Sequence, residues 1–170
     1  SEPRRASVWR DREGAGPVAD KTKILLIDDN AADRELIARM LGSQAMVLAA
    51  TNVVEGLEIY RNERPDCVLL DHYLPGMAGL DGLATFVQEK AVVSMITGAG
   101  SEQLGAEAFK RGARDYILKR SLTESVLWRM INRELERRRL EIDLHASRER
   151  FDEIAARIPE VLWVRSLEGE

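Results

Sequence analysis

Ile24-Leu25-Leu26-Ile27-Asp28-Asp29-Asn30 runs four large apolar residues directly into two adjacent carboxylates. A short apolar run of this kind is typical of a fully buried strand. The two acidic residues follow at the point where the strand ends, although neighbouring negative charges repel each other. The stretch therefore predicts a buried strand and, at its carboxyl end, a site where something offsets the charge.

Four similar apolar runs follow, separated by segments with helical spacing. The sequence predicts strands at Lys23 to Ile27, Met46 to Ala50, Cys67 to Leu70, Ala91 to Ile96 and Asp115 to Leu118. It predicts helices at Ala31 to Leu41, Val53 to Asn62, Leu80 to Glu89 and Glu102 to Arg111, with Asn30 and Ser101 as N-caps and Gly42 and Gly112 as C-terminal stops. Strands that are apolar on both faces and joined by helices form a parallel sheet with helices on each side. We therefore expect a doubly wound five-stranded α/β domain.

The composition narrows the class of protein. The chain has 170 residues, 45% of them hydrophobic and 32% charged, which suffices for one packed domain with additional segments. The net charge of -4 does not indicate nucleic-acid binding, and no apolar run approaches the ~20 residues of a membrane span. Cys67 is the only cysteine, so we expect no intrachain disulfide, a reducing cytoplasm and a buried, unreactive thiol. Residues 1–21 have little apolar periodicity, and we expect a disordered leader there.

One long helix is predicted from about Leu122 to Pro159. It contains the charged stretch 133–139, which is typical of a solvated helix. Apolar residues at helical spacing form two seams that do not share a register: Trp128, Ile131, Leu135 and Ile142, then Leu140, Leu144, Phe151, Ile154 and Ile158, with Ser147 in a seam position. Either the helix forms a coiled coil with a register change, or it packs first on its own domain and then on a partner. We expect a homodimer through this helix; a monomeric connector is the alternative.

Polar side chains follow four of the predicted strands at their carboxyl ends, where ligands of such sheets bind. They are Asp28, Asp29, Asp71, Thr97 and Lys119. Two carboxylates about 4 Å apart repel by roughly 4 kcal/mol at an effective dielectric constant of about 20, so three need a cation among them. Oxygen ligands without histidine or cysteine favour Mg²⁺. We expect Asp29 and Asp71 to bind it directly and Asp28 mainly through water. A metal, a lysine and a hydroxyl suit phosphoryl transfer, with Asp71 as the nucleophile.

Four motifs in this order resemble the receiver domain of two-component response regulators over roughly residues 22 to 133. They are the acidic pair Asp28-Asp29, the phosphoacceptor segment Asp71-His72-Tyr73-Leu74-Pro75-Gly76-Met77, the switch-threonine strand Met95-Ile96-Thr97-Gly98 and the last strand Gly112-Ala113-Arg114-Asp115-Tyr116-Ile117-Leu118-Lys119. The resemblance implies a flavodoxin-like sheet with strand order 2-1-3-4-5 and an extended C-terminal helix. It implies a signalling module, not an enzyme, that catalyses only its own phosphorylation and dephosphorylation.

The same resemblance implies a role for each site residue. A histidine kinase, a phosphotransfer protein or a small phosphodonor would phosphorylate Asp71 in the presence of Mg²⁺. Tyr73 would give a backbone carbonyl to the metal, and Lys119 would pair with the phosphoryl group. Thr97 would move to bond that group while Tyr116 turns inward. Tyr73 and Ala99 would set the lifetime of the phosphorylated state, and the bulk of Tyr73 predicts slow loss of the phosphoryl group.

The chain departs from the common receiver pattern after Lys119. Arg120 stands where many receivers have a proline, often after a cis bond, so we leave open whether the Lys119-Arg120 bond is cis. Residues 119–123 resemble receivers fused to downstream sensor or enzyme modules. We expect a helical linker at 134–158, and residues 159–170 resemble the start of a PAS domain that the chain contains only in part.

Two other functions fit parts of the site. A Mg²⁺ phosphatase would use Asp71 as nucleophile, but such enzymes usually need a second acid two residues later, where this chain has Tyr73. A degenerate receiver that serves only as a scaffold is the third hypothesis, although every active-site residue type is present.

Overall fold

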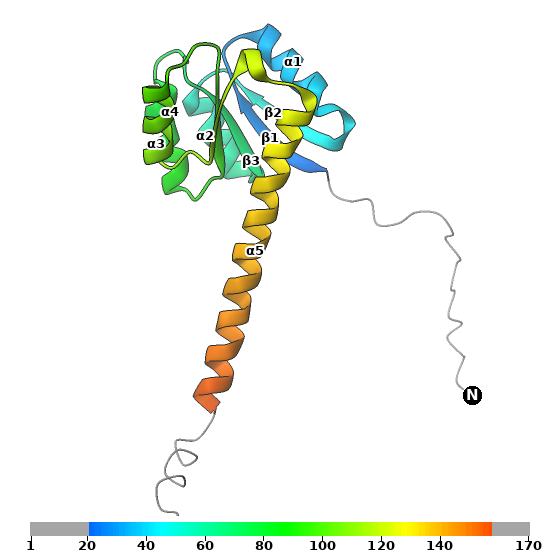
Figure 1. Cartoon of the computed structure of the whole chain (residues 1–170), viewed down its shortest axis with the longest axis vertical. Helices are drawn as coiled ribbons and strands as arrows, with labels where there is room; N and C mark the ends of the chain where they lie inside the picture. The colour runs from blue at the N-terminus through cyan, green and yellow to red at the C-terminus, as the bar shows by residue number, and fades with distance from the viewer. Residues whose placement is uncertain (1–20, 158–170) are drawn as a thin grey trace, which may run out of the picture.

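Residues 21–157 are described by the computed structural model, in which a compact body carries one long projecting helix (Figure 1). The strands are β1 (Thr22–Ile27), β2 (Ala45–Ala50), β3 (Cys67–Asp71), β4 (Val93–Thr97) and β5 (Asp115–Leu118). The helices are α1 (Ala31–Leu41), α2 (Val53–Glu63), α3 (Gly79–Gln88), α4 (Glu102–Lys110) and α5 (Glu124–Arg157), with short 3-10 turns at Gly42–Gln44 and Lys119–Ser121. The expected leader, apart from Lys21, and the expected PAS-like segment lie outside the described residues.

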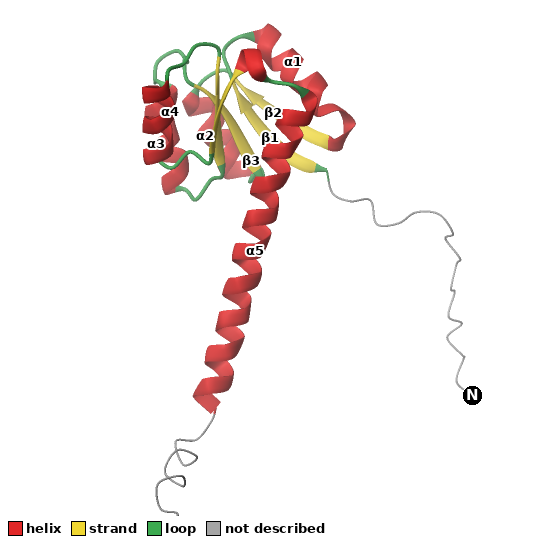
Figure 2. Ribbon diagram, in the orientation of Figure 1, coloured by secondary structure: helices red, strands yellow, loops and turns green. Residues whose placement is uncertain are grey.

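The five strands form one parallel sheet in the order β2-β1-β3-β4-β5 (Figure 2). This confirms the predicted doubly wound, flavodoxin-like fold. The strand register sets Ile27 beside both Ala50 and Leu70, and Thr97 beside Leu118. Because parallel strands run in one direction, the residues that follow β1, β3, β4 and β5 all reach the same edge of the sheet.

Both faces of the sheet are buried, because successive side chains of a strand point to opposite faces. Leu25 and Ile27 of β1 belong to the core beneath α2, α3 and α4, which also contains Phe86. Ile24 and Leu26 belong to the core beneath α1 and α5. The continuous apolar run at 24–27 thus supplies both cores, which explains why it shows no polar alternation.

The helix boundaries follow the predicted capping residues. The Asn30 side chain accepts hydrogen bonds from the first turn of α1, and the Ser101 hydroxyl accepts one from Leu104 N at 3.2 Å. Gly42 ends α1 with a φ of 59°, in the left-handed region that favours glycine. The predicted start of β4 at Ala91 was wrong, because Ala91 N donates to Phe86 O at 3.0 Å in the turn that follows α3; the strand begins at Val93.

Helix α5 is 34 residues long, and only its first part packs on the sheet. Leu127, Met130 and Ile131 are buried there, and Figure 1 shows the remainder extending away from the body. This agrees with the first part of the second alternative, in which the helix packs first on its own domain. The interpretation of 133–139 as fully solvated was wrong at Glu134, which is only 4% exposed because it lies on the same face as Leu127 and Ile131. Within 21–157, the helices are too short or too polar to cross a membrane.

Candidate functional site at the carboxyl edge of the sheet

Three carboxylates meet beyond the ends of β1 and β3. One oxygen each of Asp28, Asp29 and Asp71 lies within 4.8 Å of the other two. Asp28 and Asp71 are 1% and 5% exposed, whereas Asp29 is exposed. The sheet register holds the three residues together, because β1 and β3 are adjacent and end at the same level. The predicted acidic cluster is therefore present.

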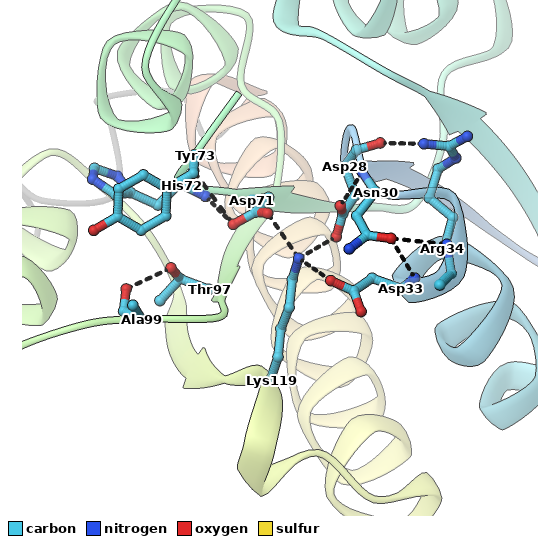
Figure 3. A network of polar contacts seen from close by, with 11 residues as sticks. Asp28, Asn30, Asp33, Arg34, Asp71, His72, Tyr73, Thr97, Ala99 and Lys119 are labelled. Atoms are coloured by element: carbon cyan, nitrogen blue, oxygen red, sulfur yellow. Dashed lines mark hydrogen bonds and ion pairs between the residues drawn. The ribbon is translucent and has the colours of Figure 1, made fainter. Parts of the chain in front are cut away.

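The Lys119 ammonium group lies among these carboxylates (Figure 3). Its Nζ atom is 2.7 Å from Asp28 Oδ2, 2.8 Å from Asp71 Oδ2 and 2.7 Å from Asp33 Oδ2. Lys119 follows β5 directly and opens a single 3-10 turn, and the peptide bonds of the described residues are all trans, including Lys119-Arg120. The sequence predicted Lys119 as a site residue. That prediction did not include Asp33, which lies in the first turn of α1.

The charges at this edge are strongly coupled. Burial disfavours the charged form of Lys119, but its hydrogen bonds to Asp28, Asp33 and Asp71 outweigh burial and raise its pKa. Burial raises the pKa of Asp28, although the hydrogen bond from Lys119 opposes that shift. The lysine is thus firmly cationic, and it offsets part of the negative charge that the strand ends bring together.

Backbone groups fix the orientation of Asp71. Its Oδ1 atom accepts hydrogen bonds from His72 N at 2.6 Å and Tyr73 N at 3.4 Å, which leaves Oδ2 for Lys119. The start of α3 packs closely behind it: a Cβ on Gly79 would lie 2.1 Å from Asp71 O. Glycine is therefore required there, because any side chain would push α3 away from the carboxylate.

Asp28 is held in the same way on the other side of the cluster. Its Oδ1 atom accepts a hydrogen bond from Asn30 N at 2.9 Å, and its backbone carbonyl accepts one from Arg34 Nη1 at 2.7 Å. Asn30 has a second task, because its own side chain caps α1. The loop that presents the acidic pair is therefore continuous with the first turn of α1.

Thr97 is buried at the end of β4, next to the cluster. Its hydroxyl donates a hydrogen bond to Ala99 O at 2.8 Å and makes none to Asp71 in the described structure. The hydroxyl of Tyr116 on β5 is buried and has no hydrogen-bond partner among the described residues. The Tyr116 ring lies against Gly100 and Gly105, so a Cβ on Gly100 would lie 1.8 Å from the tyrosine oxygen. Tyr116 thus fills the space beneath the loop that follows Thr97.

Tyr73 and His72 lie beside Asp71 in the loop after β3. The Tyr73 ring meets the His72 ring edge-on, with centroids 4.6 Å apart, and Tyr73 is 58% exposed. Figure 3 shows the two rings next to each other, on the opposite side of Asp71 from Lys119. His72 Nδ1 is buried and makes no hydrogen bond within the described structure. His72 and Tyr73 contact Asp71 through their backbone N–H groups, and their rings lie beside this aspartate.

The ligand atoms of the cluster fit a hard divalent cation. All three are carboxylate oxygens, and no imidazole or thiolate is among them. The chain's one cysteine lies elsewhere: Cys67 is buried at the start of β3, where burial raises the pKa of its thiol to about 12. The thiol is therefore unreactive at neutral pH, as predicted.

Comparisons with known proteins agree with this geometry. Residues 24–132 match the family model for the response regulator receiver domain. The chemotaxis protein CheY of Listeria monocytogenes is 32% identical over 109 residues, which cover 62% of this chain and 92% of that protein. The response regulator protein PilR of Pseudomonas aeruginosa is 36% identical over 103 residues, covering 58% of this chain and 23% of PilR.

A solved structure shows the same fold. A chain in the crystal structure of the CheX-CheY-BeF3-Mg²⁺ complex from Borrelia burgdorferi has a TM-score of 0.60 and 25% identity, covering 64% of this chain and 85% of that one. Receiver domains are signalling modules of two-component systems, not classical enzymes. The chain belongs to the response regulator receiver domain family.

Proposed function

We propose that this chain accepts a phosphoryl group on Asp71 from a histidine kinase or a phosphotransfer protein. The observation that carries the proposal is the placement of Asp71 itself. Its carboxylate is buried at the end of a central strand, is oriented by two backbone N–H groups and is paired with Lys119 at 2.8 Å. A carboxylate held in this way is suited to act as a nucleophile.

The transfer forms one bond and breaks one. A carboxylate oxygen of Asp71 attacks the phosphorus atom, the bond between phosphorus and the donor's nitrogen breaks, and the imidazole of the donor leaves with the electron pair and takes up a proton. The ammonium group of Lys119 attracts the charged oxygens of the phosphoryl group. Self-catalysed loss of the phosphoryl group, by attack of water on phosphorus, returns Asp71 to its carboxylate.

Magnesium is the proposed cofactor. The carboxylates of Asp29 and Asp71 and the backbone carbonyl of Tyr73 are the proposed direct ligands, and Asp28 would act mainly through water. When bound, Mg²⁺ neutralises charge on the phosphoryl oxygens. Because Lys119 contacts two of the same carboxylates, the lysine and the metal share the task of offsetting the acidic cluster.

Thr97 and Tyr116 are the proposed switch residues. To bond a phosphoryl group on Asp71, the Thr97 hydroxyl must leave the Ala99 carbonyl that it now contacts. That movement changes the loop against which Tyr116 packs. Phosphorylation of Asp71 would thereby alter the surface formed by α4, β5 and the start of α5. Tyr73 and Ala99, which flank the site, are proposed to control how water reaches the phosphorylated aspartate.

The proposed output runs through the C-terminal helix. The receiver unit spans 22–133, the linker 134–158, and 159–170 would open a PAS-like domain that leads to a further sensor or effector module. Phosphorylation would change a homodimer formed through α5. A cytoplasmic location and the absence of direct nucleic-acid binding remain predictions.

Phosphorylation by a small donor tests the central claim. The chain is incubated with Mg²⁺ and acetyl phosphate or phosphoramidate, and intact mass spectrometry should show one added phosphoryl group. Asp71→Asn should abolish the addition, and chelation of Mg²⁺ with EDTA should prevent it. Asp81→Asn is the matched control, because Asp81 is an exposed aspartate on α3 that pairs with Arg111.

The same experiment separates the alternatives. A scaffold that has lost its chemistry would gain no phosphoryl group under any condition. A phosphatase would turn over the donor many times per chain without holding the group, so released phosphate would far exceed one equivalent in the first minutes. One retained phosphoryl group per chain, on Asp71, contradicts both.

A further inference from the structure

The second half of α5 carries an exposed row of apolar side chains. Leu140, Leu144, Phe151 and Ile154 are 62%, 72%, 70% and 62% exposed. With Ser147 between them, their spacing alternates between four and three residues. This alternation is the heptad pattern of a coiled-coil seam, with Leu144 and Phe151 at a positions and Leu140, Ser147 and Ile154 at d positions. Residues 140–154 therefore form a continuous apolar seam.

The seam has a defined start. In the same register, the preceding a and d positions are occupied by Arg137 and Arg133. Arg133 pairs with Asp115 of the body, and Arg137 Nε lies 3.4 Å from Glu141 Oε1. Two arginines in seam positions oppose close approach of a second helix, so the apolar seam begins at Leu140, beside the outermost ion pair of α5 with the body, Glu141 with Arg114 at 3.9 Å.

We propose that this seam pairs with the same seam of a second copy of the chain, as a parallel, in-register two-stranded coiled coil that begins at Leu140. The inference rests on the homodimer in the proposed function and adds its interface and orientation. In a parallel, in-register pair each apolar seam residue faces the same residue of the second copy: Leu140, Leu144, Phe151 and Ile154. Ser147 faces Ser147, and a single polar layer of this kind fixes the register at some cost in stability.

Charges beside the seam favour the parallel orientation. Asp143 is at a g position and Arg148 at the following e position. In a parallel pair, a g residue of one helix lies beside the next e residue of the other helix. Asp143 of each copy would therefore lie beside Arg148 of the other, which gives two attractive pairs by symmetry.

Antiparallel pairing is less favourable in both available registers. Setting Leu144 against Ile154 of the second copy places Arg148 near Arg148 and Arg150 near Arg150. Shifting by one heptad removes these like-charge contacts, but it sets Ile154 against Arg137 and Leu144 against Ser147. Only the parallel register pairs each apolar seam residue with an apolar residue and also sets Asp143 beside Arg148, although it brings Glu136 beside Glu141 where the seam begins.

The first experiment compares two exposed apolar residues on the same helix. Leu144 is in the seam, whereas Ile142, 59% exposed, is at an f position on the far side. Sedimentation equilibrium of the full chain should give a dimer whose Kd rises at least about 30-fold in Leu144→Ala and less than about threefold in Ile142→Ala. Equal effects of the two substitutions on the dimer Kd would contradict the proposal that the seam is the dimer interface.

The second experiment reads the orientation by disulfide formation under mild oxidation. Ser147→Cys should cross-link the two copies, because the two seam positions face each other only in a parallel, in-register pair. Glu149→Cys, at the outward f position, is the matched control and should not. Native Cys67 is buried and should give no background. If Ser147→Cys alone stays uncross-linked while a mixture of Ser147→Cys and Phe151→Cys chains cross-links, the helices are antiparallel and the proposal fails.

A charge exchange tests the register independently. Asp143→Arg and Arg148→Asp should each raise the dimer Kd about tenfold, because each turns two attractive pairs into repulsive ones. The double variant should return close to the wild-type Kd, because the exchanged charges again attract each other. A double variant as weak as the sum of the single variants contradicts the parallel register.

These outcomes are distinguishable from failure of the receiver chemistry. Phosphorylation of Asp71 is read by mass and needs no dimer. A wild-type chain that is monomeric at all accessible concentrations, but becomes phosphorylated, would refute the homodimer and this inference while leaving the phosphoacceptor role standing. An antiparallel dimer would refute this inference alone.

Discussion

Lys119 balances the charge of the site in this structure, because its ammonium group contacts three carboxylates at 2.7 to 2.8 Å. Removing one partner of a buried ion pair costs about 3 to 5 kcal/mol, since the other charge stays buried without compensation. We expect Lys119→Gln to lower the free energy of unfolding by about 2 to 4 kcal/mol. Mg²⁺ should then raise the melting temperature of the variant more than that of the wild type, because the freed carboxylates lack another cation.

Urea unfolding measures the loss of stability, and thermal unfolding with and without Mg²⁺ measures the change in melting temperature. Lys23→Gln is a suitable control, because Lys23 forms an exposed pair with Glu63 far from the cluster. A Lys119→Gln variant that is as stable as the wild type, or that gains no more from Mg²⁺, would show that the lysine does not balance the acidic cluster.

Asp33 would compete with a phosphoryl group on Asp71 for Lys119, because it already pairs with the lysine at 2.7 Å. It belongs to the first turn of α1, and its carboxylate is partly exposed, so its pairing with Lys119 is worth about 0.5 to 1 kcal/mol. We expect Asp33→Asn to speed phosphorylation of Asp71 by acetyl phosphate about two- to fivefold, because Lys119 is then freer to contact the incoming group. Initial rates by intact mass spectrometry measure this, with Asp81→Asn as the control. A slower rate would mean that Asp33 instead holds the lysine in its productive position.

Tyr73 gives a prediction about the lifetime of the phosphorylated state. Its ring covers the flank of Asp71 together with His72. If the ring shields the phosphoryl group from water, Tyr73→Ala should shorten the half-life of phosphorylated Asp71 about tenfold, while Tyr73→Phe should leave it nearly unchanged. Loss of the added mass after donor removal measures both. Rapid decay in the wild type that Tyr73→Ala does not change would rule out shielding.

The sequence predicted the site residues at the strand ends but missed Asp33. Strand ends are predictable because register in a parallel sheet brings them to one edge, whatever the loops do. A contact between Lys119 and a helical residue 86 positions away depends on how α1 lies over the sheet, which no local pattern encodes. A usable signal was position: Asp33 lies three residues after the predicted N-cap Asn30, so it belongs to the first helical turn that follows the acidic pair.

The loop from β4 to α4 yields a prediction at the scale of elements. A Cβ on Gly100 would lie 1.8 Å from the Tyr116 hydroxyl, whereas a Cβ on Gly98 would meet only Lys119 Cδ at 3.9 Å. We expect Gly100→Ala to lower the free energy of unfolding by about 1 to 3 kcal/mol, because the aromatic ring or the loop must shift. Gly98→Ala should cost clearly less.

A double-mutant cycle isolates the contact between the loop and the ring. In a Tyr116→Phe background, the oxygen that meets the new Cβ is gone, so Gly100→Ala should become less destabilising. Urea unfolding of the four proteins gives the coupling free energy. Strict additivity would show that Tyr116 does not pack against Gly100 in solution.

Element boundaries were predictable where side chains cap them and less so elsewhere. Asn30 and Ser101 fixed the starts of α1 and α4, because their oxygens accept the free N–H groups of the first turn. The predicted start of β4 is two residues too early, because Ala91 and Val92 are apolar like the strand although they belong to the connection after α3, where Ala91 N bonds back to Phe86 O. The sequence predicts a solvated Glu134, because a charged residue among arginines gives no sign that its helix face is buried, whereas the structure buries it.

The whole molecule divides into a body that needs the first part of α5 and an extension that the body does not need. Leu127 is fully buried in the core with Ile24 and Ile96. We expect Leu127→Ala to lower the free energy of unfolding by about 2 to 5 kcal/mol. A chain that stops after residue 139 should keep nearly the stability of the full chain, measured at concentrations where both are monomeric.

Urea unfolding at low protein concentration tests both statements. Leu140→Ala is the matched control for Leu127→Ala, because the same side chain is removed at an exposed position of the same helix. Large destabilisation by the stop after residue 139 would mean that the extension packs on the body.

The fold as a whole was predictable from the strand and helix pattern, including the long C-terminal helix, whereas the way in which α5 packs was left open between two alternatives. Two seams out of register could mean a bent coiled coil or a change of partner, and periodicity alone does not distinguish them. Packing on the body distinguishes them: Ile131 of the first seam is buried on the sheet beside Leu127 and Met130. Ile142 of the first seam is exposed, as are Leu140 and Leu144 of the second.

The unbroken α5 also acts as a lever arm. A helix rises about 1.5 Å per residue, so Ile154 lies about 28 Å beyond Leu135, the last of the residues that pack on the sheet. A tilt of about 10° at the body would displace the far end by about 5 Å, nearly one helical pitch. Small rearrangements next to β5 are thereby magnified into movements large enough to reposition whatever follows the helix.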